Sequence, residues 1–222
     1  LVSLARESIP IELHASTQMG VHDVNGALAA KGLGLKRAIL ARELPIQDVA
    51  EISGAIDTEV FVHGALCYSY SGQCLMSSFI GGRSGNRGSC SQPCRMEYDI
   101  DGEGARGKNQ GPYLLSTRDL NTLSRLDEIV AAGVRCLKIE GRMRSPEYVA
   151  LATAAYRRAL DTGELPDGEQ AKMLALAFNR EFTRGYMLGA RHAGLTNHAV
   201  QNNAGLRLGN VVSAGGMWMR AR

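Results

Sequence analysis

Hydrophobic runs of strand length alternate with helix-like segments along the first 163 residues of the chain. Strands are predicted at residues 9–17, 35–43, 58–66 and 134–141, and helices at residues 23–32, 45–54, 117–133 and 145–163. Apolar positions recur at strand spacing in the former and at helix spacing in the latter. This alternation predicts an α/β fold with parallel strands. Four such units suit half of a (β/α)8 barrel or part of a doubly wound sheet.

The predicted helix at residues 145–163 has the clearest end signals. Ser145 suits the N-cap, Pro146 the first helical position and Gly163 the C-terminal stop. The pattern then changes, which predicts a partial barrel over residues 1–163, a helix and connector over 164–204, and the start of a truncated β domain over 205–222. We expect the sequence to be a piece of a longer protein.

The composition is that of a globular chain, with 45% apolar and 21% charged residues. No apolar run reaches about 18 residues, so neither a spanning helix nor a membrane partner is expected. The net charge of +3 is too small to indicate nucleic acid by itself. No G-x-G-x-x-G motif follows any of the predicted strands, and the HEXXH and GXSXG motifs are absent from the sequence. Dinucleotide binding and the standard hydrolase sites therefore have no support.

Four of the five cysteines lie in one glycine- and serine-rich loop over residues 64–98, namely Cys67, Cys74, Cys90 and Cys94. The odd number and low density of cysteines favour a reducing compartment such as the cytoplasm over a secreted disulfide scaffold. Clustered thiolates are typical metal ligands, and four of them meet the count for an iron–sulfur cluster or for zinc. Cys136 lies inside a predicted strand, where we expect a small buried hydrophobe.

Polar side chains gather where the predicted strands end, which is where a barrel carries its site. They are His14, Arg42, Glu43, Glu59, His63, Lys138, Glu140 and Arg142. In the strand at residues 58–66, Glu59, Phe61 and His63 should alternate onto one face.

Lys138 and Glu140 are also two residues apart, so both should face the barrel interior, with Leu137 and Ile139 packing outward against helices. A Lys–Glu pair buried there is either a structural ion pair or part of a pocket.

Several stretches resemble the collagenase-like peptidase family U32. They are "EVFVHGALCYSYSGQCLMSS", "LHASTQM", "LARELPIQDVAEI", "GNRGSCSQPCR", "LKIEGRMRSPEYVA", "YRRALDTG" and "FNREFTRGY". The resemblance implies the C-terminal half of a TIM-type (β/α)8 barrel and the start of a following small β domain. It also implies an iron–sulfur-dependent enzyme that hydroxylates a base in tRNA or rRNA. The alternatives are a collagenase-like protease acting on peptides or proteins, and a non-enzymatic binding module stabilised by zinc.

Carried over residue by residue, the resemblance implies a 4Fe-4S cluster on the four clustered cysteines. Members of the family often carry a further cysteine where this chain has Asn121, so the fourth ligand is either Cys94 or Cys136. The polar residues at the strand ends would line the substrate pocket of such an enzyme. We expect catalysis by Glu43, His63, Lys138 and Glu140, and substrate binding by His14, Glu59, Arg142, Arg83 and Arg87. Arg95 and Arg106 would add phosphate contacts around the cysteine loop.

Overall fold

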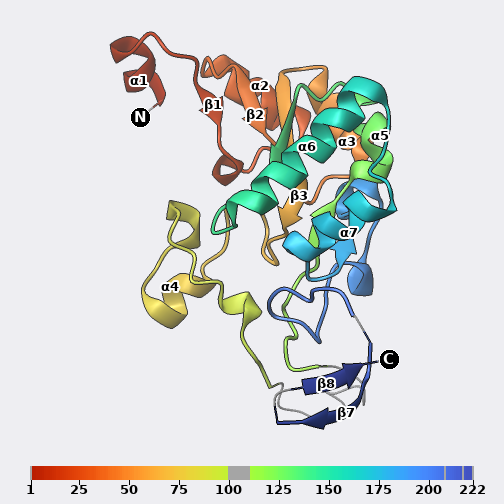
Figure 1. Cartoon of the computed structure of the whole chain (residues 1–222). Coiled ribbons are helices and arrows are strands. Elements are labelled where there is room, and N and C mark those ends of the chain that lie inside the picture. The colour runs from red at the N-terminus through yellow and green to blue at the C-terminus, as the bar shows by residue number, and fades with distance from the viewer. Residues whose placement is uncertain (1, 100–110, 208, 217, 222) are drawn as a thin grey trace.

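Four parallel strands form the main part of the sheet. The computed structural model describes residues 2–99, 111–207, 209–216 and 218–221. In it, β1 (His14–Ala15), β2 (Arg37–Ile39), β3 (Asp57–Ala65) and β5 (Cys136–Ile139) lie side by side in that order. Each of these strands overlaps one of the predicted strand segments, so the predicted α/β class with parallel strands is confirmed (Figure 1).

Two further strands complete the six-stranded sheet. β4 (Asp119–Asn121) pairs antiparallel with the end of β3 and parallel with β6 (Phe182–Thr183). The prediction of one helix over residues 117–133 was therefore wrong, because only α5 (Leu126–Ala131) is α-helical there. β4 forms hydrogen bonds with a strand on each side, and these tertiary contacts outweigh the helical pattern of the segment. Local helix propensity is weak compared with such contacts.

The remaining helices connect the strands. They are α1 (Val2–Ser8), α2 (Val24–Gly32), α3 (Ile46–Ser53), α4 (Met76–Gly81), α6 (Pro146–Thr162) and α7 (Gly168–Ala177). Short 3-10 turns occupy Thr17–Met19, Gly85–Arg87, Pro93–Arg95, Leu123–Arg125, Tyr186–Leu188 and His192–Gly194. The end signals of α6 are confirmed: the Ser145 side chain accepts a hydrogen bond from the Tyr148 amide, and Gly163 ends the helix at φ 73°.

The helices pack against one face of the parallel strands. Val60 and Val62 of β3 join the main hydrophobic cluster together with buried residues of α2, α3, α5 and α6, and Leu137 and Ile139 pack against it. The opposite face of the same strands carries charged side chains. The sheet therefore has one apolar face and one polar face. Reactive or binding side chains that come from the strands lie on the polar face.

The C-terminal residues form a separate two-stranded sheet. β7 (Val211–Gly215) pairs antiparallel with β8 (Trp218–Ala221). The hairpin lies at the bottom of Figure 1, apart from the parallel strands. Within the described residues, none of the helices is both long and apolar enough to cross a membrane.

Candidate functional site

The loop that carries the four clustered cysteines begins at the carboxyl end of β3. All four are free thiols of intermediate exposure. Burial raises the pKa of the Cys94 thiol and the charge of Arg95 opposes this effect, while the charges of Cys67, Cys90 and Cys74 raise the pKa further. The charges of the other three thiols therefore reach Cys94, which places the four cysteines in one region of the folded loop. Thiolates that repel one another favour binding a shared positive charge.

Polar groups of the loop point at the Cys90 sulfur. The Gln92 amide donates to it at 3.3 Å and the Ser77 hydroxyl at 3.8 Å. Hydrogen bonds of this kind orient a thiolate ligand and tune the group that it binds. In the part of the chain that the structure describes, no three His, Cys, Asp or Glu side chains are arranged to hold a single metal ion. The four thiols are donors of the kind that an iron–sulfur cluster or zinc takes, but they are not closed around one point, so the metal group stays a prediction.

Arg95 fastens this loop to the rest of the fold. Its guanidinium donates to the Leu66 carbonyl at 2.9 Å, to the Ser116 hydroxyl at 2.9 Å, and to the carbonyl and hydroxyl of Thr117. The side chain is buried, and burial lowers its pKa to about 10. The predicted phosphate contact of Arg95 is therefore wrong, because its donors are already used inside the protein. Arg106, predicted for the same role, lies outside the described residues.

Glu43 anchors the first part of the loop. Its carboxylate accepts hydrogen bonds from the Ser71 amide at 2.7 Å and from the Ser71 hydroxyl at 3.1 Å. The amide of Arg42 donates to the same hydroxyl at 3.1 Å. The segment after β2 therefore holds the loop between Cys67 and Cys74, and the Glu43 carboxylate is engaged in that contact.

A cleft of about 480 Å³ opens beside Cys90. Arg83 and Arg142 line it, from the cysteine loop and from the segment between β5 and α6 respectively. Gln92 and Met143 also line it, and both are non-glycine residues in the left-handed region, at φ 56° and 58°. Such backbone strain concentrates at functional sites. The structure thus brings together two predicted substrate-binding arginines and one predicted metal ligand around a cleft of ligand-binding size.

Lys138 lies on the polar face of the sheet, as predicted. Its ammonium is 3.1 Å from a Glu59 carboxylate oxygen, and Arg37 is 3.7 Å from the other oxygen. Leu137 and Ile139 pack against the main hydrophobic cluster, which confirms the predicted phase of β5. The Glu140 carboxylate, just beyond β5, accepts a hydrogen bond from the Arg142 amide at 2.8 Å.

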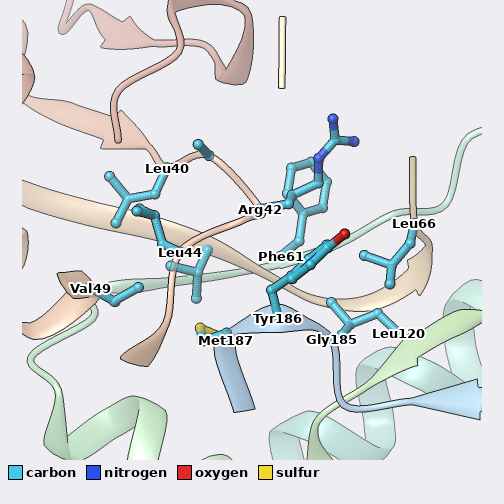
Figure 2. Close-up of a pocket in the computed structure, with 12 residues that line it drawn as sticks. Leu40, Arg42, Leu44, Val49, Phe61, Leu66, Leu120, Gly185, Tyr186 and Met187 are labelled. Carbon is cyan, nitrogen blue, oxygen red and sulfur yellow. The ribbon is translucent and has the colours of Figure 1, made fainter. Parts of the chain in front are cut away.

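Phe61 separates the charged part of this face from an apolar one. Lys138 and Arg42 both lie over its ring, at 5.4 and 5.8 Å from the centroid. Figure 2 shows the small cavity that Phe61 shares with Tyr186 and Met187, with the guanidinium of Arg42 pointing away from it. The cavity holds about 20 Å³, which is room for one water molecule rather than for a substrate.

His63 does not share a face with Glu59 and Phe61, which corrects the prediction. The register of β3 against β5 shifts between Phe61 and His63, and such an irregularity turns the next side chain. His63 packs against the rings of Tyr148, Tyr156 and Phe182, with centroids 5.6 to 5.8 Å away, and it is 1% exposed. Burial lowers its pKa to about 4. A neutral histidine held in a ring of aromatics contributes to packing rather than to the cleft.

The buried position of His63 predicts a specific pH dependence of stability. Its pKa is about 4 in the fold against 6.5 when unfolded, so only the unfolded state binds the proton between these values. Stability is therefore full above pH 6.5 and falls as the pH drops toward 4, by roughly 3 kcal/mol in total. In urea unfolding measured across this range, His63→Leu should lose about that much less stability than the parent protein. Parallel pH profiles for the two proteins would contradict the assignment.

The other predicted residues lie apart from the cleft. His14 pairs in register with Arg37 at the start of β2, so it is at the amino ends of the strands and not at their carboxyl ends as predicted. Arg87 is exposed on the cysteine loop. Cys136 is half-buried, and its thiol contacts the Glu59 carboxylate. Burial raises the pKa of this thiol, and the charge of Glu59 raises it further. Cys136 is thus not the purely apolar core residue that was predicted.

Sequence reasoning missed a buried ion pair that supports the end of β3. Asp119 accepts hydrogen bonds from the Arg180 guanidinium at 2.6 Å and from the Arg180 amide at 2.9 Å, and both side chains are buried. Arg144 lies 3.9 Å from the same carboxylate and stacks on the Phe178 ring at 3.4 Å. In the sequence, Asp119 and Arg180 are only two charged residues within the segments "STRDLN" and "FNREFTRGY". Nothing in either segment indicates that the two side chains form an ion pair.

Fold and site define an α/β protein with a four-cysteine group at the carboxyl end of a central strand. Sequence comparison gives its family. The family model described as "Peptidase family U32" matches residues 1–197. The chain belongs to that family, which confirms the resemblance seen in the cysteine motif.

Curated relatives carry names of two kinds. The chain is 38% identical over 216 residues to a 23S rRNA 5-hydroxycytidine synthase of Escherichia coli, covering 91% of this chain and 33% of the relative. It is 36% identical over 210 residues to a tRNA hydroxylation protein of Helicobacter pylori, covering 85% and 49%. It is 35% identical over 204 residues to a collagenase of Porphyromonas gingivalis, covering 82% and 49%. The chain thus spans a third to a half of these relatives. No solved structure matches it.

Proposed function

We propose that the protein is an iron–sulfur-dependent enzyme that hydroxylates a base in tRNA or rRNA, and that this chain supplies its cysteine site and part of its substrate cleft. The observation that carries the proposal is the cleft beside Cys90, lined by Arg83 and Arg142. A redox group held by thiolates and a cation-lined cleft of nucleotide size are the two parts that such an enzyme needs. The relatives named for rRNA and tRNA hydroxylation support RNA as the substrate.

The fold supports a barrel for the complete enzyme. We propose that the four parallel strands are half of a (β/α)8 barrel, in which the polar face with Glu59 and Lys138 is turned inward and the helices cover the outside. The division into an apolar helix-covered face and a polar face supports this arrangement. Sites in such barrels lie at the carboxyl ends of the strands, which is where the cysteine loop follows β3.

Cys67, Cys74, Cys90 and Cys94 would hold the cluster. A 4Fe-4S cluster bound there would supply one-electron chemistry at the edge of the cleft. Cys94 is a better candidate than Cys136 for the fourth ligand. The charges of the other three thiols raise the pKa of Cys94, whereas the thiol of Cys136 contacts Glu59. The five free thiols suit a reducing compartment such as the cytoplasm, in keeping with an RNA substrate.

The residues of the cleft have separable roles in this proposal. Arg83 and Arg142 bind phosphate oxygens of the RNA, since a guanidinium matches phosphate geometry. The Glu140 carboxylate fixes the turn that presents Arg142, through its bond to the Arg142 amide. Protease chemistry has less support: His63, the histidine nearest in sequence to the cysteines, has its ring enclosed by aromatic side chains.

The proposal is tested on the full-length protein purified without oxygen. We expect brown protein with iron and sulfide, and RNA whose target base gains one oxygen atom, measured by mass spectrometry of nucleosides from cells with and without the gene. Arg142→Met should lower the modified fraction without changing the iron content. Colourless protein with stoichiometric zinc would overturn the cluster. Peptide hydrolysis that survives purification and chelation, with RNA unmodified, would favour the collagenase alternative.

A further inference from the structure

The cysteine loop has an unusual combination of side chains. Residues 66–96 contain no aspartate or glutamate and three arginines, Arg83, Arg87 and Arg95. The same stretch exposes six large apolar side chains, namely Tyr68, Tyr70, Leu75, Phe79, Ile80 and Met96. Several exposed apolar side chains on one segment mark an interaction surface, because apolar side chains without a partner are usually buried in the core of the protein.

We propose that Tyr70 and Phe79 form a stacking platform that binds unpaired bases of an RNA strand next to the cleft. The inference rests on the proposed function and assigns the RNA-binding surface of that site. Phe79 is 85% exposed and Tyr70 is 71% exposed, so the rings are open to a ligand. Unstacked bases bind to aromatic faces, whereas the bases of a duplex are stacked on one another and present no free face.

The helix that carries Phe79 is held in place relative to Cys90. α4 carries Phe79 on its exposed side and the fully buried Ser77 on its inner side. The Ser77 hydroxyl accepts a hydrogen bond from the Ser91 amide at 3.2 Å and donates to the Cys90 sulfur. One short helix therefore connects the exposed ring to a cysteine of the site, and Figure 1 shows α4 standing clear of the sheet.

The charges favour RNA over an apolar protein or lipid partner. Arg83 and Arg87 are exposed on either side of the turn at Gly85, and Arg83 and Arg142 both line the cleft. Arginines and exposed aromatic rings on one stretch, residues 66–96, that holds no acidic residue suit a strand whose phosphates are negative and whose bases are flat. The cores of protein interfaces are instead depleted of charge.

The test measures RNA affinity of the full-length protein by fluorescence anisotropy. A single-stranded oligonucleotide should bind more tightly than a hairpin in which the same bases are paired. Phe79→Ala and Tyr70→Ala should each weaken single-strand binding roughly 5- to 150-fold, as the loss of one base stack does. Phe79→Tyr should restore most of the affinity because the ring remains. Leu176→Ala, which removes a half-exposed apolar side chain on α7, should leave it unchanged.

Three results would overturn the inference. Unchanged affinity in Phe79→Ala and Tyr70→Ala, while the protein still hydroxylates RNA, would remove the platform and leave the proposed function intact. A lower unfolding midpoint of Phe79→Ala without loss of affinity would mean that another part of the full chain covers the ring. Absence of RNA binding and of RNA modification in the parent protein, with apolar peptide or lipid vesicles bound instead, would overturn both proposals.

Discussion

Cys74→Ser should remove the proposed cluster and abolish the proposed hydroxylation while leaving the α/β framework folded. Cys74 lies in the middle of the loop, where its amide donates to the Asn86 side chain at 3.2 Å and its thiol acts on Cys94. Serine keeps the size of the side chain but is a poor ligand for iron, because it lacks the soft thiolate. Iron and sulfide content, the visible spectrum, and the modified base in RNA should all fall to background.

The loop should also become mobile in this variant. Ligand binding and loop order are coupled, so an empty site leaves residues 68–95 held by fewer contacts. Limited proteolysis should cut this stretch faster, while far-ultraviolet circular dichroism stays unchanged because the sheet and α6 keep their own core. Cys136→Ser is the matched control, since its thiol contacts Glu59 away from the group. Full iron content and activity in Cys74→Ser would contradict the ligand assignment.

Local signals predicted the parts of the fold that depend on local chemistry. α6 begins and ends where Ser145, Pro146 and Gly163 indicated, because caps and turn glycines act on their immediate neighbours. The phase of β5 was also predictable, because alternation assigns Leu137 and Lys138 to opposite faces without reference to any other strand. The cysteine motif indicated the family for a similar reason, since its spacing is a property of one segment of the chain.

Features that depend on distant contacts could not be predicted in this way. The segment at Asp119 has a helical pattern, but its strand is decided by pairing with β3 and β6 and by the ion pair with Arg180, 61 residues away along the chain. His63 turns away from Glu59 because β3 shifts its register, and alternation alone does not show such a shift. The inward position of Arg95 likewise depends on carbonyls from two other segments.

Arg95→Lys should destabilise the fold and reduce iron retention together. The Arg95 guanidinium joins three parts of the chain, because it donates to Leu66, Ser116 and Thr117. Its neighbour Cys94 lies within electrostatic reach of the other three thiols. A lysine ammonium keeps the charge but cannot reproduce the planar fork that reaches several acceptors at once. Disrupting a buried charged network of this kind costs on the order of 3 kcal/mol. The expected result is a lower urea midpoint and less iron per protein after desalting.

The iron readout separates a positioning role from a general loss of stability. Arg95 holds the Leu66 carbonyl, and Leu66 precedes Cys67, so its loss should let Cys67 and Cys94 move apart even in protein that remains folded. At low denaturant and low temperature, where Arg95→Lys is still native by circular dichroism, it should release iron to a chelator faster than the parent. Arg157→Lys, which alters only an exposed pair with Asp161 on α6, should match the parent in both measurements. Equal iron release by Arg95→Lys and the parent, with stability alone reduced, would show that Arg95 supports the fold but does not position the cysteines.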